Sequence, residues 1–182
     1  MLYNIAMIKF ASELKLKPVL LRKEMALVGV VENLIVDPET GKFAGLLVRE
    51  GFGKKNLKTL PEKDLLSITS EFYLISGYQA LGDIDEIVRL KEIIDKKVPI
   101  VGEKVYTVSG KCLGKCRDYT LDLDRFKIDK IYVSFWSLFS NFKEYAIAFP
   151  QIVSIEKERI TVEDAVIEAA KPVEGRLADA SN

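Results

Sequence analysis

The side chains that could do chemistry are few in this chain of 182 residues, and the commonest catalytic one is missing. The sequence holds no histidine, which removes the most frequent general base, the usual catalytic triads and most zinc sites. Three Gly-Lys pairs lack the following Ser or Thr that a phosphate-binding P-loop requires; they are Gly53-Lys54, Gly110-Lys111 and Gly114-Lys115. We therefore expect no catalytic residue and no cofactor, and predict that the protein is not an enzyme.

One stretch is rich in aspartate and could be considered a calcium-binding site. It holds Asp118, Asp122, Asp124 and Asp129. A calcium loop that begins at Asp122 would need Gly at its sixth position and Glu at its twelfth. The sequence has Lys127 and Val133 there. We predict a solvated hairpin turn and no metal site.

The two cysteines, Cys112 and Cys116, do not form a disulfide framework. They fall on one predicted strand, where four residues separate them by about 13 Å. That distance exceeds the reach of a disulfide and argues against joint metal ligation. Both are predicted to be small, semi-buried apolar side chains.

The most unusual segment runs from Ser134 to Phe142 and is rich in aromatic residues. Phe135, Leu138, Phe139 and Phe142 follow the spacing i, i+3, i+4, i+7, which predicts one face of a short helix, and the only tryptophan lies beside them. The rings either pack in the protein interior or anchor a partner, as Trp and Phe commonly do. The candidate partner-binding residues are Phe135, Trp136, Leu138, Phe139 and Phe142.

A small basic loop offers an alternative site, for RNA, with Phe52, Lys54, Lys55 and Lys58. Lys+Arg and Asp+Glu balance at 27 each, so the chain as a whole has no electrostatic attraction for nucleic acid. Three lysines in a loop more often serve only solubility. Contact with RNA is therefore the second choice.

The strands and turns that must position these residues are predicted by a sequence pattern that occurs twice. Val28 to Val48 and Leu113 to Val133 follow one pattern, with Gly29 and Gly114 lying 85 positions apart, as do Asp37 and Asp122. Each copy is followed by a similar strand pattern, Leu65-Leu66-Ser67-Ile68 and Ile152-Val153-Ser154-Ile155. β-Branched residues at this density, with frequent turn signals, predict compact barrels.

The first copy contains a clear hairpin turn, Asp37-Pro38-Glu39-Thr40-Gly41. Pro38 presets φ for the start of a turn, and Gly41 can take the left-handed conformation that closes it. Phe126 and Leu123 stand at the equivalent positions of the second copy. We predict a positive φ at Gly41 but not at Phe126, and a second turn that is built differently.

A connector of another kind separates the two copies. Asp83 and Glu86 match a capping box, apolar residues follow at helical spacing, and Pro99 prevents further winding. We predict one helix from about Ile84 to Lys97. The predicted division is a first barrel at 1–76, a connector at 77–97, a second barrel at 98–163 and a tail at 164–182.

Both copies resemble the PRC-barrel domain, a family named after the cytoplasmic domain of the photosynthetic reaction-centre H subunit. The same barrel forms the C-terminal half of a bacterial ribosome maturation factor. The first copy carries the resemblance in Val28-Gly29-Val30, Leu34 to Lys42, Leu46-Leu47-Val48 and Leu60 to Ile68. The second carries it in Lys111 to Lys115, Asp118, Leu121-Asp122 and Ser154-Ile155. The resemblance implies a six-stranded barrel without a shared active site, in a family that mostly binds proteins or RNA–protein assemblies.

The sequence thus predicts a mainly β protein of two tandem small PRC-type β-barrels joined by one α-helix. The expected function is a non-enzymatic scaffold or adaptor that binds another protein or a second copy of itself, with RNA or ribosome-assembly binding as the alternative. No uncharged apolar stretch reaches the roughly 20 residues of a membrane span. The N-terminus has no basic signal-peptide region, so a cytoplasmic location is expected.

Overall fold

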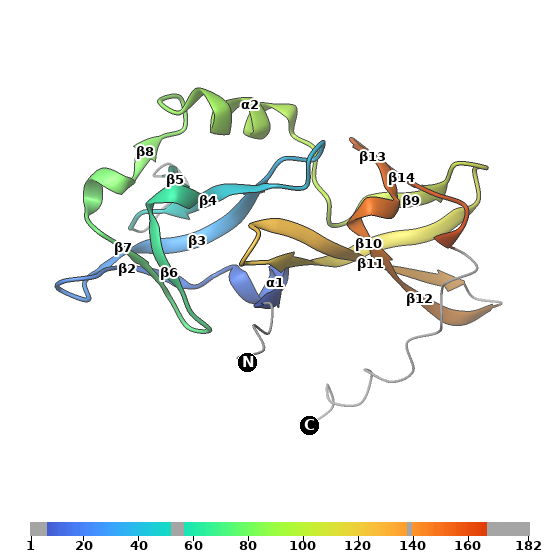
Figure 1. Ribbon diagram of the computed structural model, residues 1–182, viewed down its shortest axis with the longest axis horizontal. Helices are drawn as coiled ribbons and strands as arrows, with labels where there is room; N and C mark the ends of the chain where they lie inside the picture. The colour runs from blue at the N-terminus through green and yellow to red at the C-terminus, as the bar shows by residue number, and fades with distance from the viewer. Residues whose placement is uncertain (1–6, 52–56, 138–139, 167–182) are drawn as a thin grey trace, which may run out of the picture.

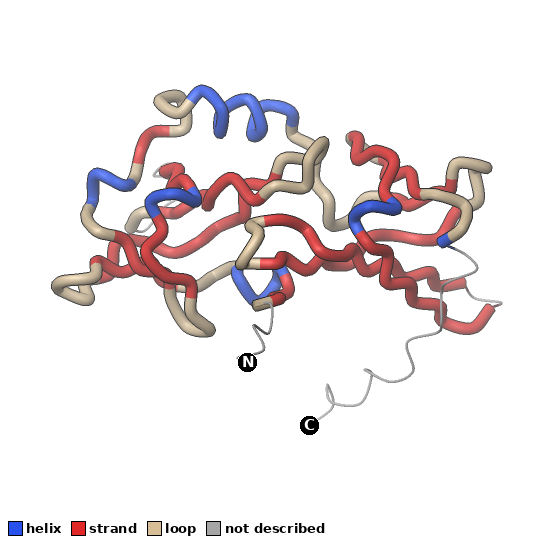
Figure 2. The backbone as a smooth tube through the Cα atoms, in the orientation of Figure 1, coloured by secondary structure: helices blue, strands red, loops and turns tan. Residues whose placement is uncertain are grey.

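The computed structural model describes residues 7–51, 57–137 and 140–166, with only the backbone of residues 136, 137 and 140–143. The protein is mainly β and consists of two curled sheets (Figures 1 and 2). Two α-helices occur in these ranges, α1 (Ala11–Leu14) and α2 (Val88–Lys96). No helix in the described part of the chain is long and apolar enough to cross a bilayer.

The first sheet has the strand order β6-β7-β2-β3-β4-β5-β8. Its strands are β2 (Pro18–Leu21), β3 (Leu27–Val36), β4 (Phe43–Arg49), β5 (Leu57–Pro61), β6 (Leu65–Ile68), β7 (Tyr73–Ile75) and β8 (Gly82–Asp83). Two short 3-10 turns, η1 (Glu62–Asp64) and η2 (Tyr78–Ala80), connect them. Residues 18–83 are called the first half below.

The second sheet has the order β12-β11-β10-β9-β14-β13. Its strands are β9 (Lys104–Thr107), β10 (Cys112–Asp122), β11 (Lys127–Ser137), β12 (Ser140–Ala148), β13 (Ile152–Glu156) and β14 (Arg159–Val162), with η3 (Phe149–Gln151) before β13. Residues 104–166 are called the second half. Read from β5 to β6, the first sheet follows the same order as the second from β12 to β13, and each has one parallel pair, β2·β7 and β9·β14.

The repeat extends to local irregularities of the backbone. The β3·β4 ladder shifts register between Val31 and Asn33, and the β10·β11 ladder shifts between Cys116 and Asp118, 85 positions later. At each shift the Asn33 or Asp118 side chain accepts a hydrogen bond from the next backbone N–H, at 3.0 and 2.8 Å. Such bulges bend a strand and increase its twist, so the same curl is built into both sheets.

The repeated glycines sit where a neighbouring strand passes too close for a side chain. A Cβ on Gly29 would lie 2.6 Å from the Arg49 carbonyl oxygen, and one on Gly114 would lie 2.2 Å from that of Ser134. Arg49 and Ser134 are themselves 85 positions apart. Close backbone approach therefore accounts for the glycine in both copies.

The two hairpin turns are more alike than the sequence predicts. Gly41 has a φ of 68°, which confirms the prediction for the first turn. Phe126 has a φ of 50°, so the prediction for the second turn was wrong. Both turns begin with an aspartate that accepts a hydrogen bond from the N–H two residues on, at 3.0 Å in each case, and this start leads to a left-handed residue in both.

Contacts around Phe126 compensate for its backbone conformation, which costs an L-residue about 1–2 kcal/mol. Its ring stacks on that of Phe43, with centroids 5.9 Å apart, and its carbonyl accepts the Phe43 N–H at 2.8 Å. The Phe126 side chain is also packed against the main apolar core.

The connector helix is shorter than predicted. The Glu86 carboxylate does reach back to the Asp83 N–H, at 2.8 Å, but α2 begins only at Val88. The predicted first turn is wrong because Gly82 and Asp83 are held extended as β8, paired with β5. The helix ends at Lys96, directly before the left-handed Lys97, and its buried Leu90 packs with Ile35 and Ala44.

The N-terminal strand β1 (Ile8–Phe10) joins the second sheet rather than the first, because it pairs antiparallel with β10. A single core cluster of buried side chains includes residues of both halves, such as Val19 and Val31 of the first and Val105 and Tyr119 of the second. The predicted domain boundaries stay a prediction, but a strand that precedes the first half completes the second. Cys116 is buried and Cys112 exposed, and both are free thiols.

Candidate partner-binding site

The aromatic segment forms a β-hairpin, and the predicted short helix is wrong. Strands β11 and β12 pair from Lys130 with Ala148 to Ser137 with Ser140, with one register shift between Phe135 and Ser137. Phe135, Trp136 and Phe142 therefore lie on two neighbouring strands, and Phe135 is half-buried. The side chains of Trp136 and Phe142, and the whole of Leu138 and Phe139, fall outside the described residues. The helical spacing of the aromatic residues gave the wrong prediction because pairing with a neighbouring strand determines the backbone conformation here. That pairing cannot be seen in a single segment of sequence.

The base of this hairpin is held by contacts to other strands. The Tyr132 ring packs on that of Phe10 in β1, with centroids 5.0 Å apart. The Arg117 guanidinium donates a hydrogen bond to the Ser134 hydroxyl at 2.6 Å. Groups mounted on such fixed strands are positioned more precisely than groups on loops.

Strand β12 is an edge strand of the second sheet and is longer than its counterpart β5, with nine residues against five. In the first half the outer edge of β5 is covered by β8, through Lys58 with Asp83 and Thr59 with Gly82. Among residues 7–51, 57–137 and 140–166, no strand covers the outer edge of β12. An uncovered edge presents backbone donors and acceptors to which another strand can bind.

The basic loop of the RNA alternative is described only at Lys58, and Phe52, Lys54 and Lys55 lie outside the described residues. Lys58 is on β5, where its ammonium donates to the Asp83 carboxylate at 2.8 Å. That hydrogen bond raises the pKa of Lys58. The charge of Lys58 is therefore already paired within the protein.

The four aspartates that were considered as calcium ligands each accept hydrogen bonds from the protein. Asp118 accepts from the Ser12 hydroxyl at 2.5 Å, and Asp122 accepts from the Asp124 and Arg125 N–H groups at 3.0 and 3.1 Å. Asp124 accepts from the Met7 N–H and Asp129 from the Thr120 hydroxyl. In the described ranges no group of three or more His, Cys, Asp or Glu side chains is arranged to hold a metal.

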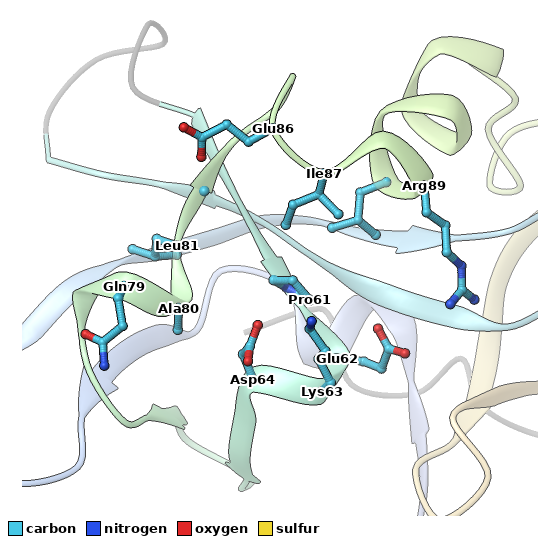
Figure 3. Close-up of a pocket in the computed structure, with 12 residues that line it drawn as sticks. Pro61, Glu62, Lys63, Asp64, Gln79, Ala80, Leu81, Glu86, Ile87 and Arg89 are labelled. Carbon is cyan, nitrogen blue, oxygen red and sulfur yellow. The ribbon is translucent and has the colours of Figure 1, made fainter.

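A pocket of about 360 Å³ lies between η1, η2, β8 and the start of α2 (Figure 3). It is lined by charges of both signs, Glu62, Asp64 and Glu86 with Lys63 and Arg89, and its lining holds no serine or cysteine nucleophile. The carboxylate of Glu86 is engaged by the Asp83 N–H. No motif in the sequence marks this pocket, because its residues come from separate elements of the chain.

The sheets that carry these candidate sites resemble a known family over part of the chain. A search of the curated proteins found no match. The family model of the PRC-barrel domain matches residues 7–86, which run from the start of β1 through β8. This match confirms the resemblance of the first copy to the PRC-barrel domain over residues 7–86.

Proposed function

We propose that this protein is a non-enzymatic scaffold or adaptor of two tandem PRC-type barrels. In this proposal the β11–β12 hairpin, with Phe135, Trp136, Leu138, Phe139 and Phe142, binds another protein or a second copy of the chain. The observation that carries the proposal is the uncovered outer edge of β12, which continues into the aromatic hairpin.

The proposal of a second PRC-type barrel is supported by the way in which the second half repeats the first. The strand order, the parallel pair, the two register shifts and the crowded glycine all recur at a constant offset. Independent features of this kind recur together when two segments have one fold. The second half then differs from the first chiefly in its long β12 and in its aromatic segment.

That difference favours contact with a protein. An edge strand offers main-chain hydrogen bonds to an incoming strand, and neighbouring aromatic side chains supply apolar contact and specificity. Burial of each ring is worth about 1.5–3 kcal/mol, which is enough for several rings to hold a partner. In the first half β8 covers β5 at Lys58 and Thr59, and the counterpart segment from Gly51 to Asn56 holds one aromatic residue, Phe52.

The test is affinity capture from the native host with the full-length protein, with and without RNase. Three baits are compared: the wild type, Trp136→Ala/Phe139→Ala and Lys54→Ala/Lys55→Ala. The proposal predicts one set of partners that survives RNase, is lost with the aromatic variant and is kept with the lysine variant. Size-exclusion chromatography with light scattering shows whether the partner is a second copy.

Two results would reject the proposal. Partners that disappear with RNase, or with the lysine variant alone, would point to the basic loop and to RNA. Partners that remain bound to the aromatic variant would remove the hairpin from the interface.

A further inference from the structure

The two halves meet at their equivalent hairpin turns by a symmetric pair of backbone hydrogen bonds. The Phe43 N–H donates to the Phe126 carbonyl at 2.8 Å, and the Ile128 N–H donates to the Gly41 carbonyl at 2.9 Å. Phe43 is 85 positions before Ile128, and Gly41 is 85 positions before Phe126. Exchanging the two halves therefore turns each bond into the other.

Lys42 and Lys127 lie between these bonds as an antiparallel bridge, and they are equivalent residues, again 85 positions apart. A bridge flanked by bonds in this way is the non-hydrogen-bonded pair of an antiparallel ladder, with Cα atoms about 4.5 Å apart. A residue that faces its own equivalent marks a local two-fold axis. We infer that the two halves are docked as a two-fold pair, so that this surface is built to bind another copy of the same repeat.

One cavity near the axis is lined by residues from both halves. Leu34 and Tyr119 are equivalent residues, and both line one cavity of about 340 Å³. Lys15 and Val101, which precede equivalent strands, also line it. The Phe43 and Phe126 rings stack between the two halves, a contact that their equivalents Ile128 and Gly41, which have no rings, do not repeat.

The segment that precedes each half in the sequence packs on the other half. Before the first half, β1 pairs with β10, and Ser12 of α1 donates to Asp118 of β10 at 2.5 Å. Before the second half, α2 packs its Leu90 on Ile35 of β3 and Ala44 of β4. Strands β3 and β10 are counterparts, so the two leading segments are exchanged reciprocally, as the arms of an intertwined dimer are.

This arrangement makes the chain one rigid body rather than two barrels on a tether. Figure 1 shows the β3–β4 hairpin reaching toward the second half and the β10–β11 hairpin reaching back. The opposite ends of these hairpins, where β4 leads to β5 and β11 leads to β12, then lie at two-fold-related ends of the body. The inference does not depend on which partner, if any, binds at either end.

The test begins with the full chain carrying a specific protease site inserted after the exposed Lys97. The chain is folded, cleaved and passed through size-exclusion chromatography with light scattering in native buffer. A self-sufficient two-fold interface predicts that both fragments co-elute at the mass of the intact chain, 20.5 kDa plus the insert. Separation of the fragments would overturn the inference.

A second measurement uses the uncut chain and does not depend on the insertion. In a Cys112→Ser background, Lys42→Cys/Lys127→Cys should form an intramolecular disulfide on mild oxidation, since a Cα separation of about 4.5 Å is within disulfide reach. The control Lys42→Cys/Lys130→Cys places the second thiol about 10 Å further along β11 and should not form the bond. Failure of the first pair, or equal reaction of both pairs, would contradict the two-fold axis.

Discussion

At the scale of single residues, glycine is required where two neighbouring strands approach each other most closely. Gly114 has a φ of +122°, and a Cβ there would lie 2.2 Å from the Ser134 carbonyl oxygen. Gly102 also has a positive φ, +97°, but nothing lies within 4 Å of its Cβ position. A side chain at Gly102 would therefore meet backbone strain alone, whereas one at Gly114 would meet both strain and a steric clash.

We predict that Gly114→Ala destabilises the protein by about 3 kcal/mol or more, because strain and a backbone clash add. Gly102→Ala should cost only about 1–2 kcal/mol, from strain alone. Urea unfolding of both variants measures the difference. Equal losses would mean that β11 can move away from β10 without penalty.

Three buried groups predict that stability falls in alkaline solution. Burial, helped by the Asp118 charge, raises the pKa of Cys116 from 9.0 to about 12, and burial raises the pKa of Tyr73 and Tyr119 above 10.0. The unfolded chain ionises these groups first, so their contribution is fully present below about pH 9 and is lost as pH rises toward the folded pKa values. Each group can contribute up to about 1.4 kcal/mol per pH unit.

The free energy of unfolding should therefore decrease steeply between about pH 9 and 11. Urea titrations at several pH values measure it. Cys112→Ser is the control, since Cys112 is exposed and its replacement should leave the slope unchanged. A free energy of unfolding that stays constant to pH 11 would show that these side chains are hydrated.

At the scale of elements, the sequence predicted those parts that depend on local chemistry. The turn at Gly41, the pattern of the long strands and the capping contact of Glu86 were all readable from short segments. The aromatic segment was misread because its helical spacing is also compatible with two strands whose pairing depends on residues farther along the chain. Phe126 was misread because its left-handed conformation is supported by Phe43, a residue of the other half.

The strand β1 gives a test of how the N-terminus contributes. Deletion of residues 1–6 leaves Met7, whose N–H meets Asp124 at 3.1 Å, and should change the melting temperature by less than about 3 °C. Deletion of residues 1–10 also removes the pairing with β10 and the packing of Phe10 on Tyr132. We expect a loss of about 2–4 kcal/mol, or on the order of 10 °C. Calorimetry of both truncated proteins measures this difference. Equal melting temperatures would mean that β1 does not contribute to stability.

The aromatic hairpin predicts a variant that loses association but not the fold. Trp136→Ala/Phe139→Ala should keep the wild-type circular dichroism spectrum and melt within a few degrees of the wild type. Rings buried in the core would instead cost roughly 5 kcal/mol or more when truncated. Tyr78→Ala, which removes an exposed aromatic ring elsewhere, is the control for non-specific effects. An unfolded double variant would end the interface hypothesis.

At the scale of the whole molecule, the two halves are joined by contacts that reach across their boundary. One core cluster spans both halves, β1 crosses to the second sheet, and the two turns are hydrogen-bonded to each other. An adaptor built in this way would hold its two ends at a fixed distance and orientation.

The most direct test of this central claim is urea unfolding followed by two probes at once. The single tryptophan, Trp136, lies in the second half and reports on that half, whereas far-ultraviolet circular dichroism reports on both sheets. The account predicts one cooperative transition with coincident midpoints for the two probes. Two separate transitions, with tryptophan fluorescence changing at a urea concentration where half of the circular dichroism signal remains, would show that the halves are independent and would contradict it.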